Sequence, residues 1–493
     1  MNPDEVRSHA RKGAAWTLII SAIAFPLSYA RYILLGRVGH TTEVLGTFAL
    51  LLLFLNAIYT FFFPGGRNVF PTYFPKLSSE EGRSGLVSGF LYLVAAAAAA
   101  GLILALLRPE LFDVLLQQRV DARTRTVLLF LIPFALFSAL ANSIVTGNLS
   151  FVWASLLLRI QLVLVTLVAV VMYVTASASM IADAVLWLGG AMVVGAVVNL
   201  CVSSWLLRRW VRVRWRPRFP SGCLKFTMFT YFDTIMVWIN NAIDRFFVAV
   251  YFSVAQLGIY FALFEVARIV PLAVQQVEHL LLATFSKLLG GDAEDSVVSG
   301  YRRVSRITVG IYALVSVTVI FLSRPLASIF GATYVEHHHY LICLAVVVNI
   351  DSLRTINGIT LMAYERMPSV FVSNVLQNII QFGVTLALIE PMGVYGVIVG
   401  KGAGHVACAI ALFVATARVG KTRKLLPPLV YVLSQVVVFA AAWVAYRYED
   451  RGIGVSALLV MVGWAVIWLG GGFSIDDIRA LIPWRRRSAG TGP

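Results

Sequence analysis

The sequence has little charge for its length. Only 13% of its 493 residues are charged, whereas 59% are hydrophobic, and its mean hydropathy is +0.83. Soluble domains carry about 25% charged residues, so this composition excludes an ordinary soluble protein. The apolar residues also fall into long runs, which predicts an all-α polytopic membrane protein.

Several chemical signatures are missing as well. The four cysteines lie far apart in the sequence, so we expect neither a disulfide nor a metal site. The chain has no glycine-rich nucleotide loop, no paired-histidine zinc motif and no nucleophile elbow. These absences argue against an enzyme and against transport driven by ATP. We therefore predict no catalytic residue, no metal and no cofactor.

Acidic residues are scarce beside basic ones. The chain has 40 Lys and Arg against 24 Asp and Glu, a net charge of +16. In a soluble protein this excess would suggest a nucleic-acid partner. Here most basic residues stand in short loops between apolar runs, as the positive-inside rule of membrane proteins requires. We expect no nucleic-acid partner.

Apolar segments of membrane-spanning length make up most of the chain. A spanning helix needs about 20 apolar residues, and fourteen segments qualify. They are roughly 14–36, 42–63, 85–107, 125–147, 151–174, 182–207, 225–250, 257–283, 306–324, 338–362, 369–388, 394–417, 428–446 and 453–471. Counts of 12 or 13 would require one segment to be merged or dropped.

The densest charge lies between the sixth and seventh segments. Six arginines and no acid occur between Arg208 and Pro220. So many arginines do not cross a bilayer cheaply, so this stretch should be cytoplasmic, with both chain termini on the same side. It predicts an N-lobe at 1–207, a basic linker at 208–224, a C-lobe at 225–420, and two extra helices with a basic tail at 421–493.

A short repeat supports two related lobes. Leu45–Phe48 and Leu257–Tyr260 share the pattern Leu-Gly-x-aromatic, and each opens the second segment of its half. Six segments separate them, so both halves would enter the membrane in the same direction. That is the parallel kind of internal repeat found in transporters.

Basic residues within the apolar segments are the candidate substrate site. Each would cost about 2.5–3.5 kcal/mol at the centre of a lipid-facing helix, so most should face a cavity or a partner. Guanidinium groups match phosphate oxygens in pairs, so such a cavity would suit a phosphate or pyrophosphate. The six are Arg31, Arg159, Arg245, Arg268, Arg354 and Lys401.

Four acids within the segments could couple transport to a proton or a sodium ion. They are Asp233, Asp244, Glu265 and Asp351. A structural role stays open for some of these charges. Glu265 stands three residues before Arg268, a spacing that permits an ion pair on one helix face. Asp351 stands three residues before Arg354, with the same consequence.

Polar stripes mark two further segments. The stripe within Asp233–Asp244 and the stripe within Asn374–Gln381 could line a cavity or hold helices together by hydrogen bonds. His405 follows Lys401 by one helical turn and is a further cavity candidate. The run His337–His339 indicates a polar cap at the membrane interface rather than a metal site.

Short motifs also recur in the order typical of one transporter family. In chain order they are Lys12–Thr17, Arg31–Gly39, Leu45–Phe48, Asp244–Phe247 with Leu257–Tyr260, Ile329–Tyr334, Ala363–Arg366 and Pro391–Gly396. Together they resemble the polysaccharide flippases of the MOP superfamily, the Wzx type. This resemblance covers residues 12 to about 420. In it, Arg31 matches the family's basic position late in the first helix.

The resemblance implies two six-helix lobes that face each other across a central cavity. Alternating access would then move an isoprenoid-pyrophosphate-linked oligosaccharide from the inner to the outer leaflet, for lipopolysaccharide or exopolysaccharide biosynthesis. Its partners would be this substrate, the lipid bilayer and a coupling ion, H⁺ or Na⁺. We expect a monomer in the bacterial cytoplasmic (inner) membrane.

Other readings of the same residues stay open. Two helices after the twelfth resemble the lipid II flippase branch, MurJ. The related drug transporters, MATE, share the lobes but favour cationic drugs, which the basic residues within the helices argue against. A membrane-embedded polysaccharide polymerase or ligase would need a long outer loop, whereas the longest here is 108–124.

Overall fold

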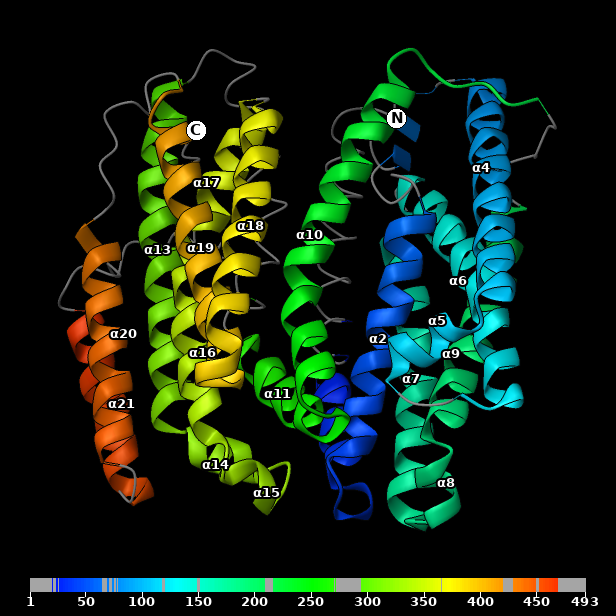
Figure 1. Cartoon of the computed structure of the whole chain (residues 1–493). Helices are drawn as coiled ribbons and strands as arrows, with labels where there is room; N and C mark the ends of the chain where they lie inside the picture. The colour runs from blue at the N-terminus through cyan, green and yellow to red at the C-terminus, as the bar shows by residue number, and fades with distance from the viewer. Residues whose placement is uncertain are drawn as a thin grey trace, which may run out of the picture. The chain divides into compact units, whose positions relative to one another are not determined.

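Helices fill the part of the chain that the computed structural model describes (Figure 1). The described residues are 20, 24, 26–63, 69–70, 73–74, 77, 79–117, 120–148, 151–208, 216–269, 271, 294–364, 366–419, 429–448 and 452–468. No strand occurs within these ranges, and the predicted all-α class is confirmed.

The chain forms two compact units, residues 1–262 and 263–493. In the first unit, a helix at 26–37 is followed by η1 (Val38–His40), α2 (Glu43–Phe62), α4 (Glu80–Leu107), α5 (Glu110–Leu116), α6 (Ala122–Gly147), α7 (Phe151–Thr175), α8 (Ala178–Ala182), α9 (Ala184–Leu207) and α10 (Cys223–Tyr251). The next helix, α11 (Val254–Ala267), contains the boundary between the units. Division into lobes at the linker 208–224 stays a prediction.

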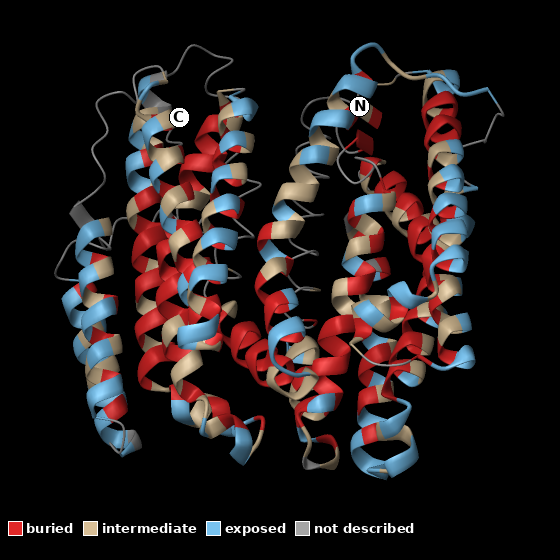
Figure 2. Ribbon diagram, viewed as in Figure 1, coloured by how far each residue is buried: buried red, intermediate tan, exposed pale blue. Residues whose placement is uncertain are grey.

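The second unit continues from α11. Its further helices are α13 (Glu294–Phe321), α14 (Ser323–Ser328), α15 (Ala332–Val335), α16 (His338–Ile350), α17 (Ser352–Ala363), α18 (Met367–Met392), α19 (Val394–Thr416), α20 (Leu429–Arg447) and α21 (Ile453–Ile467). Large apolar side chains such as Leu107, Val174 and Trp443 are exposed, as expected where a helix faces lipid (Figure 2).

Helical residues occur in all fourteen predicted segments. Among the described residues, nine helices are long and apolar enough to span a membrane, and three shorter apolar helices accompany them. The more polar α10 is not among the nine, and the ends of the segments 14–36 and 257–283 lie partly outside the described residues. The predicted span at 338–362 is one of the nine, His338–Ala363, and Asp351 marks the point within it where α16 gives way to α17.

The predicted outer loop 108–124 also differs from expectation, because it contains the short helix α5. Phe112 of α5 is buried, and its ring lies 5.7 Å from that of Phe54 in α2. Asp121 then caps the N-terminus of α6 by accepting hydrogen bonds from backbone N–H groups. The Thr124 side chain and these backbone N–H groups lower the pKa of the Asp121 carboxyl.

The two copies of the Leu-Gly-x-aromatic repeat meet where α2 crosses α11. A Cβ on Gly46 would lie 2.9 Å from the carbonyl carbon of Val254, four residues before the second glycine. A Cβ on Gly258 would lie 2.9 Å from the backbone nitrogen of Gly46 and would overlap the carbonyl oxygen of Thr42, four residues before the first glycine. Because each glycine has no side chain, the backbone of the other helix approaches it closely at the equivalent position. Any side chain at either glycine would prevent this contact.

The end of the arginine-rich stretch packs against α4. The Arg218 backbone N–H donates to the Gly85 carbonyl, 3.1 Å away, and its guanidinium pairs with Glu81 at 2.8 Å. The Phe219 ring covers Gly89, where an added Cβ would lie 2.5 Å from it. The two glycines of α4 therefore hold a connecting segment rather than another helix.

Glycines also explain the polar stripe of α18. A Cβ on Gly400 of α19 would lie 2.8 Å from the Thr385 nitrogen, and one on Gly404 would lie 2.9 Å from the Gln377 carbonyl oxygen. Gln377 and Gln381 are fully buried. These contacts show that α18 packs closely on α19. Whether the stripe lines a cavity or joins helices by hydrogen bonds stays a prediction.

Candidate functional site

The six basic residues within the helices differ in burial. Three are nearly inaccessible, with exposed fractions of 8% for Arg31, 7% for Arg245 and 3% for Lys401. Arg159 and Arg354 are half-buried. Arg268 is also half-buried, with 40% of its side chain exposed.

In the first unit, buried cations lie against aromatic rings. The Arg31 guanidinium carbon is 4.7 Å from the Tyr32 ring centroid and 4.9 Å from that of Phe48. Tyr32 packs edge-on against Phe261 at 5.4 Å, and the Arg245 guanidinium carbon lies 5.9 Å from the same Phe261 ring. Aromatic faces stabilise cations that have left water. Within the described residues, the Nε of Arg31 has no hydrogen-bond partner.

Asp244 lies beside this group and is fully buried. The hydroxyl of Tyr260 donates a hydrogen bond to its Oδ2 at 2.6 Å. The neighbouring Arg245 instead donates to the carbonyl oxygen of Asn241, one turn earlier in α10. Asp244 and Arg245 therefore have separate partners, as adjacent helix positions predict. Asp233, earlier on the same helix, is only half-buried. We call Arg31, Tyr32, Asp244, Arg245, Tyr260 and Phe261 the first-unit cluster.

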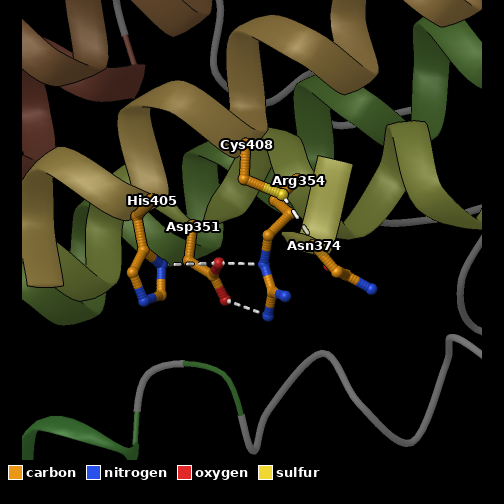
Figure 3. A network of polar contacts seen from close by, with 5 residues as sticks. All are labelled: Asp351, Arg354, Asn374, His405 and Cys408. Atoms are coloured by element: carbon orange, nitrogen blue, oxygen red, sulfur yellow. Dashed lines mark hydrogen bonds and ion pairs between the residues drawn. The ribbon is translucent and has the colours of Figure 1, made fainter. Parts of the chain in front are cut away.

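The second unit holds a network of charged side chains centred on Asp351 (Figure 3). Arg354 donates to both carboxylate oxygens, with Nη2 3.2 Å from Oδ2 and Nε bonded to Oδ1. From α19, Nδ1 of His405 lies 2.9 Å from Oδ1 of the same carboxylate. Arg354 and His405 thus approach Asp351 from two different helices.

Asp351 lies where α16 meets α17. Its backbone keeps right-handed helical angles, and its side chain makes no cap hydrogen bond to α17. Beside it, Sγ of Cys408 lies 3.9 Å from Oδ1 of Asn374 in α18. Nε2 of His405 is buried and has no hydrogen-bond partner among the described residues. We call Asp351, Arg354, Asn374, His405 and Cys408 the second-unit cluster.

Two further cations of the second unit share one aromatic ring. Nζ of Lys401 lies 4.8 Å from the Phe264 ring centroid, and the guanidinium carbon of Arg268 lies 5.9 Å from it. Arg268 also pairs with Glu265 at 2.9 Å. Lys401 is one turn before His405 on α19, so basic groups gather along one side of this helix.

The ion pairs that the i,i+3 spacing permits are therefore both present, Glu265 with Arg268 and Asp351 with Arg354. The contacts above bring Arg31 near Arg245, and Lys401 near Arg268, but they bring no other candidate residue to Arg159. Whether these side chains bind substrate or couple an ion stays a prediction.

Several partners of these charges could not be predicted from the sequence. The pairing of Asp351 with His405 joins residues 54 positions apart, so no local spacing indicates it. Tyr260 and Phe48, by contrast, are the aromatic residues of the repeat motif, and each contacts a buried charge. The sequence did mark these two aromatic residues as equivalent, because the motif occurs in both halves of the chain.

Among the described residues, no group of three or more His, Cys, Asp or Glu is placed to hold a metal ion. The four cysteines are free thiols. In the histidine run, Nδ1 of His338 lies 2.8 Å from the Val335 carbonyl oxygen, and His337 makes the same kind of contact with Thr333. These contacts are local ones within α15 and the start of α16.

Comparison with known sequence families gives one match. The model of a family described as "Polysaccharide biosynthesis protein" matches residues 78–337, more than half of the chain. The chain belongs to this family. No curated protein sequence matches it significantly.

Solved membrane transporters share its fold. The lipid II flippase MurJ in an inward closed conformation aligns over 94% of this chain and 99% of its own, with a TM-score of 0.70 and 15% identity. An inward-facing multidrug resistance MATE transporter of the MOP superfamily covers 87% of this chain and 98% of its own, with a TM-score of 0.65 and 12% identity.

A MOP superfamily transporter from Pyrococcus furiosus aligns as well, over 84% of this chain and 95% of its own, with a TM-score of 0.61 and 14% identity. These likenesses establish the fold. Together with the family match, they confirm the resemblance to MOP-type polysaccharide proteins that the sequence motifs indicated.

Proposed function

We propose that this protein is a flippase that moves an isoprenoid-pyrophosphate-linked oligosaccharide between the leaflets of the bacterial cytoplasmic membrane, from the inner to the outer one. Alternating access drives the movement, and the product serves surface polysaccharide biosynthesis. The family match and the transporter fold support this class of activity. The chain acts as a monomer with both termini in the cytoplasm.

The observation that carries the proposal is the burial of Arg31, Arg245 and Lys401 inside an apolar protein. Burying a cation is costly, and such residues in membrane helices usually mark a substrate or ion path. Aromatic rings beside the three cations offset part of this cost. A pyrophosphate is the anionic part of the proposed substrate, and the guanidinium group is suited to it.

Coupling to H⁺ or Na⁺ is assigned to the buried acids. Asp244 and Asp351 are the best candidates because each is buried and already hydrogen-bonded to a group that can adjust when its charge changes. Glu265 is buried as well and, like Asp351, forms an ion pair with the arginine three residues later. Asp233 is a secondary candidate because it is only half-buried. No enzymatic step is proposed for either cluster.

Reconstitution tests the proposal. Purified protein in proteoliposomes should move a fluorescent polyprenyl-pyrophosphate oligosaccharide across the bilayer, measured by the accessibility of its sugar to an added glycosidase. Protein-free vesicles and a fluorescent phosphatidylcholine serve as controls, and neither should show movement. Transport of a cationic drug with no movement of the glycolipid would instead favour a drug antiporter. Elongation or transfer of the glycan without translocation would favour a polymerase or ligase.

A further inference from the structure

The first unit contains a cavity of about 260 Å³ between α4, α6 and α9. Helix α6 packs against both α4 and α9 and contributes Phe137 and Ile144 to the lining, while α4 contributes Leu91. The lining side chains are apolar except for Ser204 and Arg208, at the end of α9. The cavity is therefore amphipathic along its length, with its only charge at one end.

The charged end coincides with the start of the arginine-rich stretch. Arg208 is exposed and is the first of six arginines that end with Arg218. Trp205, three residues earlier, is half-exposed. Tryptophan is enriched at the level of lipid headgroups, so Arg208, about 4.5 Å further along the helix, should reach the phosphate layer. The apolar part of the cavity then lies at the depth of the acyl chains.

The cavity fits one chain of a lipid and not a headgroup. A volume of about 260 Å³ is far larger than the roughly 10–15 Å³ that a single water needs, so the cavity can admit part of an acyl chain. The apolar walls would leave a sugar or a phosphate without hydrogen bonds. Arg208, in contrast, offers five donors to a phosphate at the mouth.

We propose that this cavity is a binding site for an anionic phospholipid of the leaflet that contacts the arginine-rich stretch. One acyl chain enters between α4 and α9 over α6, and the phosphate lies against Arg208. The site is separate from both charged clusters, and the proposal does not depend on the flippase activity. It gives the first arginine of the stretch a defined ligand.

Photolabelling of the full-length protein tests this site. Nanodiscs would contain phosphatidylglycerol with a diazirine in mid-chain, and labelled peptides would be identified by mass spectrometry. We expect labels on the facing segments of α6 and α9 around Phe137 and Ser204. Unlabelled phosphatidylglycerol should displace the probe, a test that needs no variant. A phosphatidylcholine probe should label these peptides about fivefold less, the factor that one basic residue contributes at an anionic surface.

Variants test where the acyl chain and the phosphate of the lipid bind. Ser204→Trp should close the cavity from its exposed side and abolish labelling there, whereas Val198→Trp, on an exposed position of the same helix, should not. Arg208→Ala should weaken labelling about fivefold, and the exposed Arg216→Ala should have less effect.

Three outcomes would overturn the assignment. They are labelling that unlabelled lipid does not displace, equal labelling by the neutral and anionic probes, and labelling by a polyprenyl phosphate probe in preference to the phospholipid.

Discussion

Replacement of Asp351 separates a structural role of the second-unit cluster from a functional one. Asp351→Asn keeps the shape of the side chain but leaves the Arg354 guanidinium without its counter-charge. Breaking a buried ion pair in this way costs about 3–5 kcal/mol. Because 25% of the Arg354 side chain is exposed, we expect a loss near the lower end, about 3 kcal/mol in the free energy of unfolding.

Removal of both charges has a different expected result. In Asp351→Leu combined with Arg354→Met, no buried charge is left unpaired, and such replacements are often neutral or stabilising. We therefore expect the double variant to have a free energy of unfolding close to that of the wild type. If the cluster acts in transport, the same variant should translocate substrate at least tenfold more slowly.

Equilibrium unfolding in detergent, followed by tryptophan fluorescence, measures the stability of each variant. Glu81→Gln provides a matched control, because its ion pair with Arg218 is exposed and should be worth about 1 kcal/mol or less. A stable double variant with normal translocation would show that the pair is only structural. A double variant as unstable as Asp351→Asn would show that the loss of stability does not come from the unpaired charge of Arg354.

Three further changes test the fold around the clusters. Gly46→Ala should lower stability by about 1–3 kcal/mol in thermal unfolding, because its Cβ would overlap the backbone of α11. Gly190→Ala, whose Cβ would meet no atom within 4 Å, should be neutral or slightly stabilising. Equal effects of the two variants would contradict the close contact between α2 and α11. Tyr260→Phe should cost about 1.5–3 kcal/mol, because a buried carboxylate loses a hydrogen bond, and the exposed Tyr251→Phe should cost little on the same scale. Cap hydrogen bonds lower the pKa of Asp121, so Asp121→Ala should reduce the melting temperature at neutral pH. The difference in melting temperature from the wild type should shrink as the pH falls through about 4, where the carboxylate becomes protonated. A constant difference from pH 7 to 3 would show that the charge is not involved.

The membrane-spanning helices could be predicted from the sequence because their cause is local. Twenty consecutive apolar residues can satisfy their backbone in lipid only as a helix, so run length alone located the segments. The pairs Glu265–Arg268 and Asp351–Arg354 were predictable for the same reason, since the helical repeat fixes which neighbours face each other. The exception is α10, which is not among the nine helices of spanning length and composition in the described part of the chain.

The partners of the candidate site depend on how helices cross, which no local pattern determines. His405 reaches Asp351 because α19 packs against both α16 and α17. The contact between Gly46 and Gly258 could be anticipated only in part, since the repeat indicated equivalent positions but not that they touch. Aromatic partners such as Phe264 for Lys401 gave no signal in a sequence rich in phenylalanine.

The central claim is that buried basic side chains attract the pyrophosphate of the substrate. The most direct test is the translocation rate of polyprenyl-pyrophosphate oligosaccharide by Arg31→Gln and Lys401→Gln, beside Arg302→Gln, which removes an exposed charge from α13. All three proteins must first show wild-type melting temperatures. We expect at least a tenfold loss of rate in the two buried variants and no loss in the exposed one. Equal rates in all three would contradict it.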